Sequence, residues 1–189
     1  MAEKTELIEQ FRQNYLDHLQ TETYNEHEFN DEAASISILE FEDVVPECRL
    51  YFSLGLSSYS DKVGIKSELF AASSGEWEVI PSLLASLLIT FVSLEMPIVD
   101  GQAIGGIENI SDEFIQNTGK SSIYFTEPMN VPETLGMLYL PSTQRLLTMG
   151  VFITQSEHDF LVENGPDAFE EKMAEMNVSP FDIHRPSAV

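Results

Sequence analysis

The feature that most constrains this chain is an apolar segment near its middle, IPSLLASLLITFVSLEMPIV, at residues 80–99. Pro81, Glu95 and several serines interrupt it, so it lacks the roughly 20 uninterrupted apolar residues that a membrane helix needs. We therefore predict a buried core helix that ends near Glu95. It begins at Glu76 or, because proline is tolerated in the first helical turn, near Ile80. Its apolar stripe comprises Leu83, Leu84, Leu87, Leu88, Phe91 and Val92.

Three segments that precede this helix have the composition of β-strands. In CRLYFSLGL, residues 48–56, apolar side chains alternate from Leu50 to Leu54. We expect this strand to pair antiparallel with GIKSELFAAS, residues 64–73, across the loop SSYSDKVG, which is too long for a two-residue hairpin. The segment SISILEF, residues 35–41, is predicted to be a further strand.

The N-terminal part has a different pattern. Residues 3–22 repeat apolar side chains at three- and four-residue spacings, which predicts an amphipathic helix. The next segment, TETYNEHEFNDEAA at residues 21–34, is acidic and lacks an apolar period, so we predict a connector there. We assign residues 1–30 to this N-terminal helix and connector, and residues 35–187 to the core of one compact domain that spans residues 1–189.

The second half of the chain is predicted to contain both strands and helices. Thr154 and Glu157 have the spacing of a capping box, in which each side chain bonds a backbone N–H of the first helical turn. Because the strands are grouped in threes and do not alternate with helices, we predict an α+β fold with a mixed or antiparallel sheet and flanking helices. The expected elements are a glycine-rich turn at 100–106, strands at 121–128, 136–141 and 146–153, helices at 154–165 and 167–177, and an irregular tail.

Net charge narrows the choice of partners. Thirty-two Asp and Glu residues outnumber nine Lys and Arg residues, for a formal net charge of -23. A nucleic-acid-binding protein needs a basic surface, and an anionic membrane repels an acidic protein, so we predict neither partner. The charge either keeps the protein soluble and monomeric or attracts a basic partner protein. The composition leaves both interpretations open and does not specify the oligomeric state.

The residues offer little support for catalysis or metal binding. Ser57 and Ser58 follow Gly55 but lack the second glycine of the G-x-S-x-G motif, and turn serines commonly bond local backbone groups. The histidines do not form H-E-x-x-H, and Cys48 has no companion at metal spacing, so no metal or cofactor is predicted. GQAIGG at residues 101–106 matches neither the G-x-G-x-x-G dinucleotide-binding motif nor the P-loop motif of nucleotide-binding proteins. The chain contains enough serines, histidines and carboxylates for a Ser-His-Asp catalytic triad or for a pair of catalytic carboxylates, so residue counts alone leave both possibilities open.

The first residues, MAEKTELIEQ, lack the basic and apolar regions of a secretory signal. A single cysteine cannot form an internal disulfide. We therefore expect a cytoplasmic protein.

Several short motifs resemble those of the suppressor of fused (SUFU) family, over roughly residues 35–187. Gly55-Leu56-Ser57 resembles the GxS turn that follows a strand in that family, and Glu68-Leu69-Phe70 resembles its ELF strand. The segment VFITQSEHDF is similar to the family's PIT-x-x-E pattern. The remaining motif residues are Ile153, Thr154 and Glu157, with Phe152 in place of the proline; Arg185 and Ser187, separated by Pro186; and Gly101, with Gln102 in place of a histidine.

This resemblance implies a protein-binding domain without enzymatic activity. Bacterial members of the family are thought to act as immunity proteins or antitoxins, which suggests that this chain neutralises a toxin with a basic cleft, such as a nuclease, by occlusion. The alternatives are a serine- or carboxylate-dependent hydrolase and a regulatory scaffold with an unrelated partner. Loops carry function more often than sheet interiors do. We predict a contact loop of Ser57, Ser58, Tyr59 and Asp61, and an acidic surface of Glu40, Glu42, Asp43 and Glu47 that extends it.

Overall fold

The computed structural model describes residues 2–75, 77–128, 147–177 and 179–189. In this part of the chain, a seven-stranded sheet has the order β1-β2-β3-β4-β7-β6-β5. Neighbouring strands are antiparallel except β4 and β7, which are parallel, so the sheet is mixed and the predicted α+β class is confirmed. The strands are β1 Asn25–Asn30, β2 Ser35–Val45, β3 Cys48–Leu54, β4 Glu68–Ser74, β5 Gln102–Gly105, β6 Lys120–Thr126 and β7 Leu147–Thr154.

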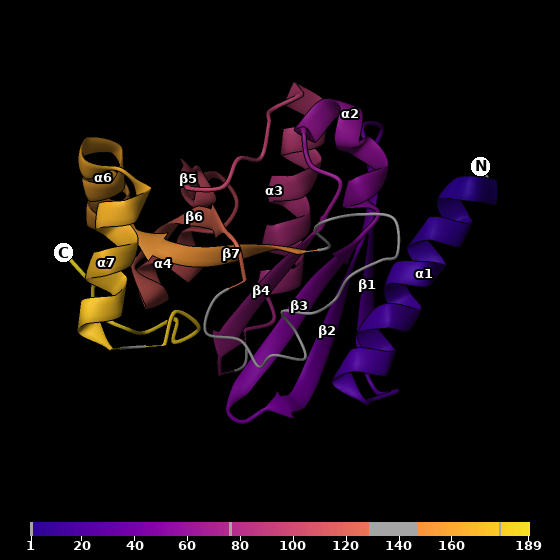
Figure 1. Cartoon of the computed structure of the whole chain (residues 1–189), viewed down its shortest axis with the longest axis horizontal. Coiled ribbons are helices and arrows are strands. Elements are labelled where there is room, and N and C mark those ends of the chain that lie inside the picture. Colours follow the sequence, from indigo (N-terminus) through magenta and orange to yellow (C-terminus); the bar gives the residue numbers. More distant parts are fainter. Residues whose placement is uncertain (1, 76, 129–146, 178) are drawn as a thin grey trace.

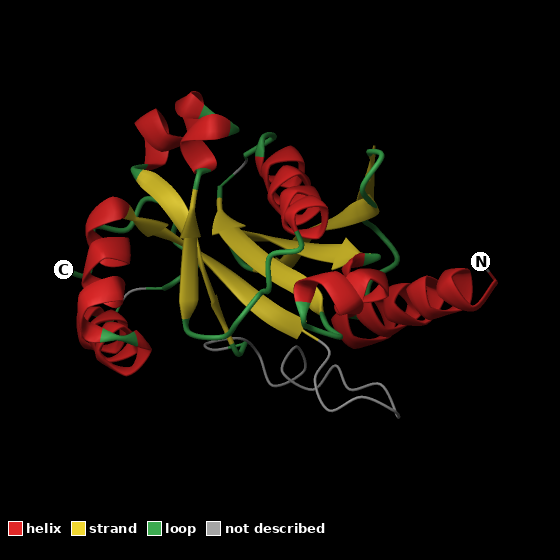
Figure 2. Ribbon diagram, turned by 90° about the horizontal axis from the view of Figure 1, so that it is seen from above, coloured by secondary structure: helices red, strands yellow, loops and turns green. Residues whose placement is uncertain are grey.

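Helices cover both faces of the sheet (Figures 1 and 2). The long helix α3 packs on one face, against side chains such as Ile38 and Leu69. Helix α1 packs on the other face, where the Tyr15 and Phe52 rings are 4.6 Å apart. The α-helices are α1 Ala2–Leu19, α2 Ser60–Val63, α3 Ile80–Leu94, α4 Asp112–Thr118, α6 Gln155–Asn164 and α7 Pro166–Met176, and the 3-10 helices are η1 Leu56–Tyr59 and η2 Ile107–Asn109.

The buried helix predicted for the apolar segment is confirmed, with the later of the two predicted starting points, Ile80. Helix α3 begins at Ile80 with Pro81 in its first turn. It ends where Glu95 takes a left-handed conformation with φ 51°, and the N–H of Met96 donates to the Phe91 carbonyl. None of the helices in the described part of the chain is long and apolar enough to cross a membrane.

Other local predictions are confirmed as well. Strands β3 and β4 pair antiparallel, with Phe52 opposite Phe70. Thr154 and Glu157 form the capping box of α6, which ends at Asn164 before Gly165. The final segment, residues 179–189, has no helix or strand, but Phe181 and Ile183 are buried in it.

Two predictions were wrong, and four short helices were not predicted: η1 and α2, in the segment expected to be a loop, and η2 and α4. The supposed connector contains β1, and the supposed glycine-rich turn contains β5. Both are edge strands with mostly exposed or half-buried side chains, so neither has an apolar alternation to reveal it. Helix α4 escaped prediction because it is short, although Ser111 caps it by accepting from the Phe114 N–H at 3.2 Å. The strand predicted at residues 136–141 lies outside the described residues.

Candidate functional site

The predicted contact loop begins with a turn that a buried carboxylate holds. The side chain of Glu68, on β4, has no exposed surface. It accepts hydrogen bonds from the backbone N–H groups of Gly55, Leu56 and Ser57, each at 3.1 Å, and from the hydroxyls of Ser57 at 2.7 Å and Ser53 at 2.6 Å. Burial raises the pKa of Glu68, and the hydroxyls of Ser53 and Ser57 oppose that shift. The Gly55–Ser57 turn is therefore fixed from inside the protein.

Gly55 is required where this turn leaves β3. Its φ is 107°, a conformation that residues with a side chain rarely adopt. A Cβ at this position would lie 3.0 Å from the Ser35 carbonyl oxygen. The Gly-x-Ser pattern seen in the sequence thus has a structural cause: glycine permits the turn, and Ser57 supplies two of the hydrogen bonds to Glu68.

The rest of the contact loop differs in accessibility. Ser57 is only 8% exposed, Ser58 and Tyr59 are half-buried, and Asp61 is exposed on α2. The Tyr59 hydroxyl accepts from the Ser35 N–H at 3.0 Å. Asp61 is therefore the most accessible residue of this loop, whereas the hydroxyl of Ser57 is directed inward.

Two of the predicted acidic residues, Glu40 and Glu42, contact Arg49 on β3. Glu40 is 4% exposed and accepts from the Arg49 guanidinium and from His27 Nε2 at 2.9 Å. Glu42 is exposed, and its Oε1 lies 3.1 Å from Arg49 Nη2. Glu47 is exposed in the turn between β2 and β3, where its φ is 62°. The side chain of Asp43 lies outside the described part of the structure.

A groove with a volume of about 790 Å³ adjoins these acidic residues. We call it the acidic groove. The end of α1, the segment that leads into β1, and β2 form its walls. Strand β1 pairs with β2 only as far as Glu40, so the groove lies where β2 extends beyond its neighbour. Its lining is Leu19, Gln20, Thr21, Thr23, Tyr24, Asn25, Glu40, Glu42 and Val44.

The two predicted groups do not form one surface. Glu47 precedes β3 and Gly55 follows it, so the seven-residue strand separates them by roughly 20 Å at about 3.3 Å per residue. The contact loop lies beside α2, and the β2–β3 turn lies at the opposite end of these strands (Figure 1). The expectation that the acidic residues extend the contact loop is therefore not met, because the extended strand carries them away from it.

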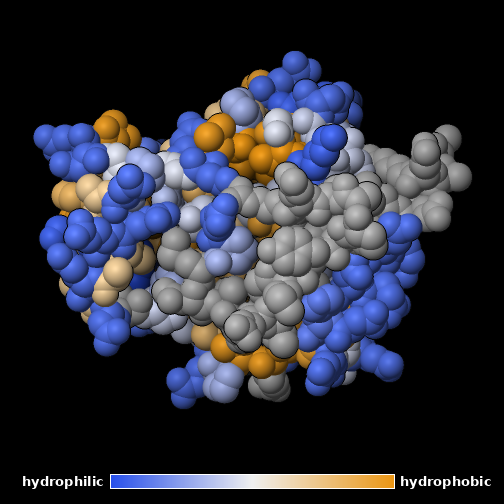
Figure 3. Space-filling model, viewed as in Figure 1, coloured by the Kyte–Doolittle hydropathy of each residue, from blue (hydrophilic) through white to orange (hydrophobic). Residues whose placement is uncertain are grey.

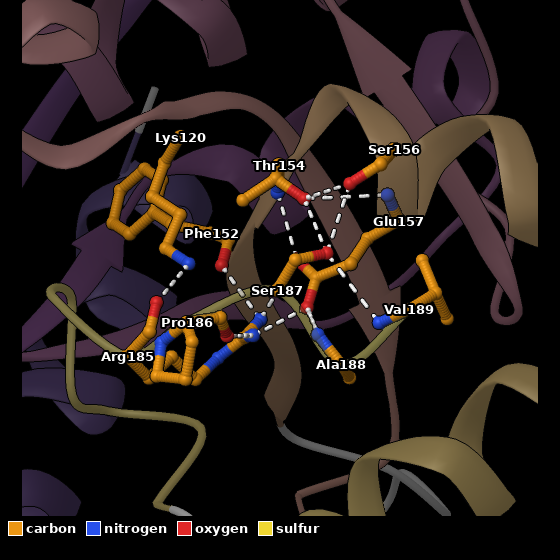
Figure 4. A network of polar contacts seen from close by, with 10 residues as sticks. All are labelled: Lys120, Phe152, Thr154, Ser156, Glu157, Arg185, Pro186, Ser187, Ala188 and Val189. Carbon is orange, nitrogen blue, oxygen red and sulfur yellow. Dashed lines mark hydrogen bonds and ion pairs between the residues drawn. The ribbon is translucent and has the colours of Figure 1, made fainter.

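A second buried carboxylate fixes the C-terminal segment (Figure 4). Glu157 and Arg185 both have side chains with no exposed surface and form a two-pronged ion pair, with Arg185 Nη2 3.1 Å from Glu157 Oε2. Glu157 also accepts from the N–H groups of Thr154 at 2.8 Å and Ala188 at 2.9 Å. Burial disfavours the charged form of Glu157, but the Arg185 guanidinium outweighs it and keeps the pKa of Glu157 below its ordinary value.

A buried lysine completes this network. Lys120, on β6, has no exposed surface, and its Nζ donates to the Arg185 carbonyl oxygen at 3.0 Å. Burial, together with the nearby Arg185 charge, lowers the pKa of Lys120 to about 8. Helix α6, strands β6 and β7 and the C-terminal segment are therefore joined through Glu157, Arg185 and Lys120.

One serine–histidine pair in the described residues resembles part of the catalytic triad of a serine hydrolase. Ser122 Oγ lies 2.8 Å from His158 Nδ1. Ser122 has no exposed surface, so a substrate cannot reach its hydroxyl. In serine hydrolases the histidine faces the nucleophile through Nε2 while Nδ1 bonds an acid, which is the reverse of this arrangement. The described residues also contain no group of three or more His, Cys, Asp and Glu side chains that could hold a metal ion.

The comparisons with known proteins agree on one family. Residues 32–186 match the model of the family "Suppressor of fused protein (SUFU)". A crystal structure of a protein described as a SUFU homolog from Neisseria gonorrhoeae is similar over 95% of this chain and 97% of its own, with 20% identity and a TM-score of 0.70. The crystal structure of the Sufu–Fu complex is similar over 96% and 91%, with 10% identity and a TM-score of 0.64. A search of curated proteins found no match.

Several of the residues that resemble the family motifs occupy the two buried carboxylate networks, whereas Gly101 lies outside both and bonds the Phe125 carbonyl. Gly55, Ser57 and Glu68 meet in the first, and Glu157 and Arg185 meet in the second. Because each network joins segments that are distant in sequence, the motif residues specify how this fold is assembled. The match over most of the chain and the shared fold show that this protein belongs to the suppressor of fused (SUFU) family.

Proposed function

We propose that this protein binds a partner protein without catalysing a reaction, and that it acts in the cytoplasm as an immunity protein or antitoxin. The partner would be a toxin with a basic cleft, such as a nuclease, which the protein neutralises by occlusion. The family membership supports a binding role, since one structure of similar fold is that of a Sufu–Fu complex. The observation that carries the proposal is the acidic groove, in a chain with a net charge of -23.

The acidic groove suits a basic surface for three physical reasons. Glu40 and Glu42 share a single guanidinium, that of Arg49, so negative charge exceeds positive charge there. Helix α1 ends at Leu19 in the groove wall, and the carboxyl end of a helix carries partial negative charge. Glu42 is exposed and is held beside Arg49 on the sheet, so its carboxylate can occupy the position of a substrate phosphate in a nuclease cleft at little entropic cost, while the buried Glu40 adds negative charge behind it.

The alternatives are a hydrolase and a scaffold for an unrelated partner. The hydrolase alternative would use a serine or a pair of carboxylates. The buried hydroxyls of Ser57 and Ser122 argue against the serine-dependent form, and a test of turnover addresses both forms. A scaffold shares the binding role but not the inhibition of its partner. Whether binding abolishes an activity of the partner therefore separates this alternative from the immunity role.

The test begins with capture of a partner from the source organism on the immobilised full-length chain. The captured protein is then purified and mixed with the chain to measure its affinity and its enzymatic activity. We expect association to slow steeply as salt rises, because the screening length falls from about 10 Å at 0.1 M to about 3 Å at 1 M. A partner that binds but keeps its activity would exclude the immunity role. Turnover of an ester or glycoside by the chain itself would exclude the non-enzymatic role.

A further inference from the structure

A second exposed surface lies at the opposite end of the sheet from the acidic groove. Among the described residues, five large apolar side chains are exposed, and two of them, Leu94 at 64% and Val99 at 49%, flank the short segment that follows α3. Pro97, between them, is also exposed. Figure 3 shows apolar surface over this connection from α3 to β5, beside α2. Isolated exposed apolar residues are common, whereas apolar residues grouped on one part of the surface are typical of interaction sites.

Backbone hydrogen bonds hold this segment in one conformation. The N–H of Met96 donates to the Phe91 carbonyl at 2.9 Å, and the N–H of Ile98 donates to the Val63 carbonyl at 2.9 Å. The N–H of Gly101 donates to the Phe125 carbonyl at 2.7 Å. The apolar side chains are thus presented by an ordered loop, so a partner that covers them need not order it first.

The same segment adjoins the predicted contact loop. Ile98 is bonded to the end of α2, and Lys62 Nζ on α2 lies 3.8 Å from Glu95 Oε1. Pro97 lies against Gly64, which ends α2. We call the resulting area the α2 surface and define it by exposed residues of α2, of the last turn of α3 and of the segment after it: Asp61, Leu94, Glu95, Pro97 and Val99.

The charge of this surface decides between two possible occupants. Asp61 and Glu95 lie beside the apolar residues, and Asp100 follows Val99, whereas Lys62 is the basic residue among them. A second copy of this chain would bring the same excess of carboxylates against it, within an overall charge of -23 for each copy. Like charges that face each other oppose association. The surface therefore fits a different protein, one with an apolar patch bordered by Lys or Arg.

We infer that the α2 surface is a docking site for such a protein, with Leu94 and Val99 at its centre and Asp61 and Glu95 at its border. An apolar centre with a polar border is the usual anatomy of a protein interface. The inference rests on the binding role proposed above, but it does not require that the partner be a toxin or that the acidic groove be occupied.

The test uses the partner captured on the full-length chain, since capture supplies the reagent and not the evidence. Affinity is measured for the double variant L94Q/V99T, which removes apolar surface without changing charge or approximate size. The control is V162T, because Val162 is 76% exposed on α6. We expect roughly thirtyfold weaker binding for the double variant, as for loss of an interface hot spot, and unchanged binding for V162T. Circular dichroism confirms that each variant is folded.

Each outcome has a distinct meaning. Equal affinity of L94Q/V99T and the original chain overturns the docking site but leaves the proposed function intact. Weaker binding to a partner that keeps its activity supports the docking site while excluding the immunity role. Dimerisation of the chain at low micromolar concentration that the double variant abolishes would assign the surface to a second copy and overturn the inference. If no protein is captured and the chain stays monomeric, both proposals are wrong.

Discussion

The hydroxyl of Ser57 donates to the carboxylate of Glu68 at 2.7 Å, and the Ser57 N–H reaches the same oxygen at 3.1 Å. Ser57 lies in η1, shortly after β3 ends, and Glu68 begins β4, so these bonds join the start of the connection between the strands to its end. The serine that resembled a nucleophile therefore has a structural role in the turn. The Glu68 carboxylate has the same structural role, because all five hydrogen bonds that it accepts come from β3 and this turn.

Replacement of Glu68 by glutamine should destabilise the protein strongly. The amide would direct an NH₂ group toward backbone N–H groups that need an acceptor, and a buried donor without a partner costs about 1–3 kcal/mol. We expect E68Q to lower the free energy of unfolding by roughly 2–4 kcal/mol, measured by urea denaturation. E163Q, at an exposed position on α6, is the matched control and should change it by less than about 0.5 kcal/mol. Equal stability of the two variants would contradict the role of Glu68.

Removal of Arg185 should leave Glu157 as a buried charge without its partner. Loss of one member of a buried ion pair typically costs about 3–5 kcal/mol, so we expect R185M to lose that much stability at pH 7. The double variant E157Q/R185M should recover part of the loss, because it removes both charges. If the double variant is no more stable than R185M, the pair does not contribute through charge.

Acid should weaken the same ion pair. The pKa of Glu157 is lower in the folded protein than in the unfolded chain. Its contribution to stability is therefore fully present above the ordinary carboxyl pKa, near 4.3, and is lost as pH falls through the lowered value. Urea midpoints compared between pH 6 and pH 3 should fall less for E157Q than for the original chain. A parallel decline in both would show that other carboxylates, such as Glu26 beside Arg12, account for it.

Lys120 should give the protein an unusual dependence on alkaline pH. Its pKa is about 8 in the folded protein and near 10.4 in an unfolded chain, so the unfolded state binds more protons between these values. Stability from this group therefore rises as pH increases through that window. We expect the difference in unfolding free energy between K120M and the original chain to shift in favour of the original chain from pH 7 to pH 9. A constant difference would show that Lys120 titrates normally.

Neutralisation of Glu42 should weaken partner binding in a salt-dependent way. Glu42 is exposed in the acidic groove, so E42Q should leave the fold intact while it slows association with a basic partner. We expect a severalfold lower association rate at 0.05 M salt and a smaller difference at 0.5 M, measured by stopped-flow fluorescence. E163Q removes the same charge from α6 and serves as the control. Equal effects of both variants would mean that net charge, and not the groove, attracts the partner.

Local sequence signals predicted the elements that depend on local interactions. The apolar stripe and Pro81 located α3, and the capping box located α6. Edge strands β1 and β5 have no such signal, because backbone pairing with β2 and β6 makes them strands and few of their side chains are buried. The family resemblance indicated a binding domain, but no pattern showed that Glu68 would accept five hydrogen bonds. Nor did any pattern show that a groove would form at Glu40 and Glu42.

The amino-acid sequence by itself determined the α+β class, the principal helices, the acidic character and the family. Hydrophobic periodicity, helix caps, charge and short motifs depend only on residues that are close together in the sequence. The tertiary structure alone decided which carboxylates are buried and which remain accessible. It also placed Asp61 and Glu47 at opposite ends of β3. Burial and proximity depend on which distant segments pack together, so they follow from the assembled sheet and not from neighbouring residues in the chain.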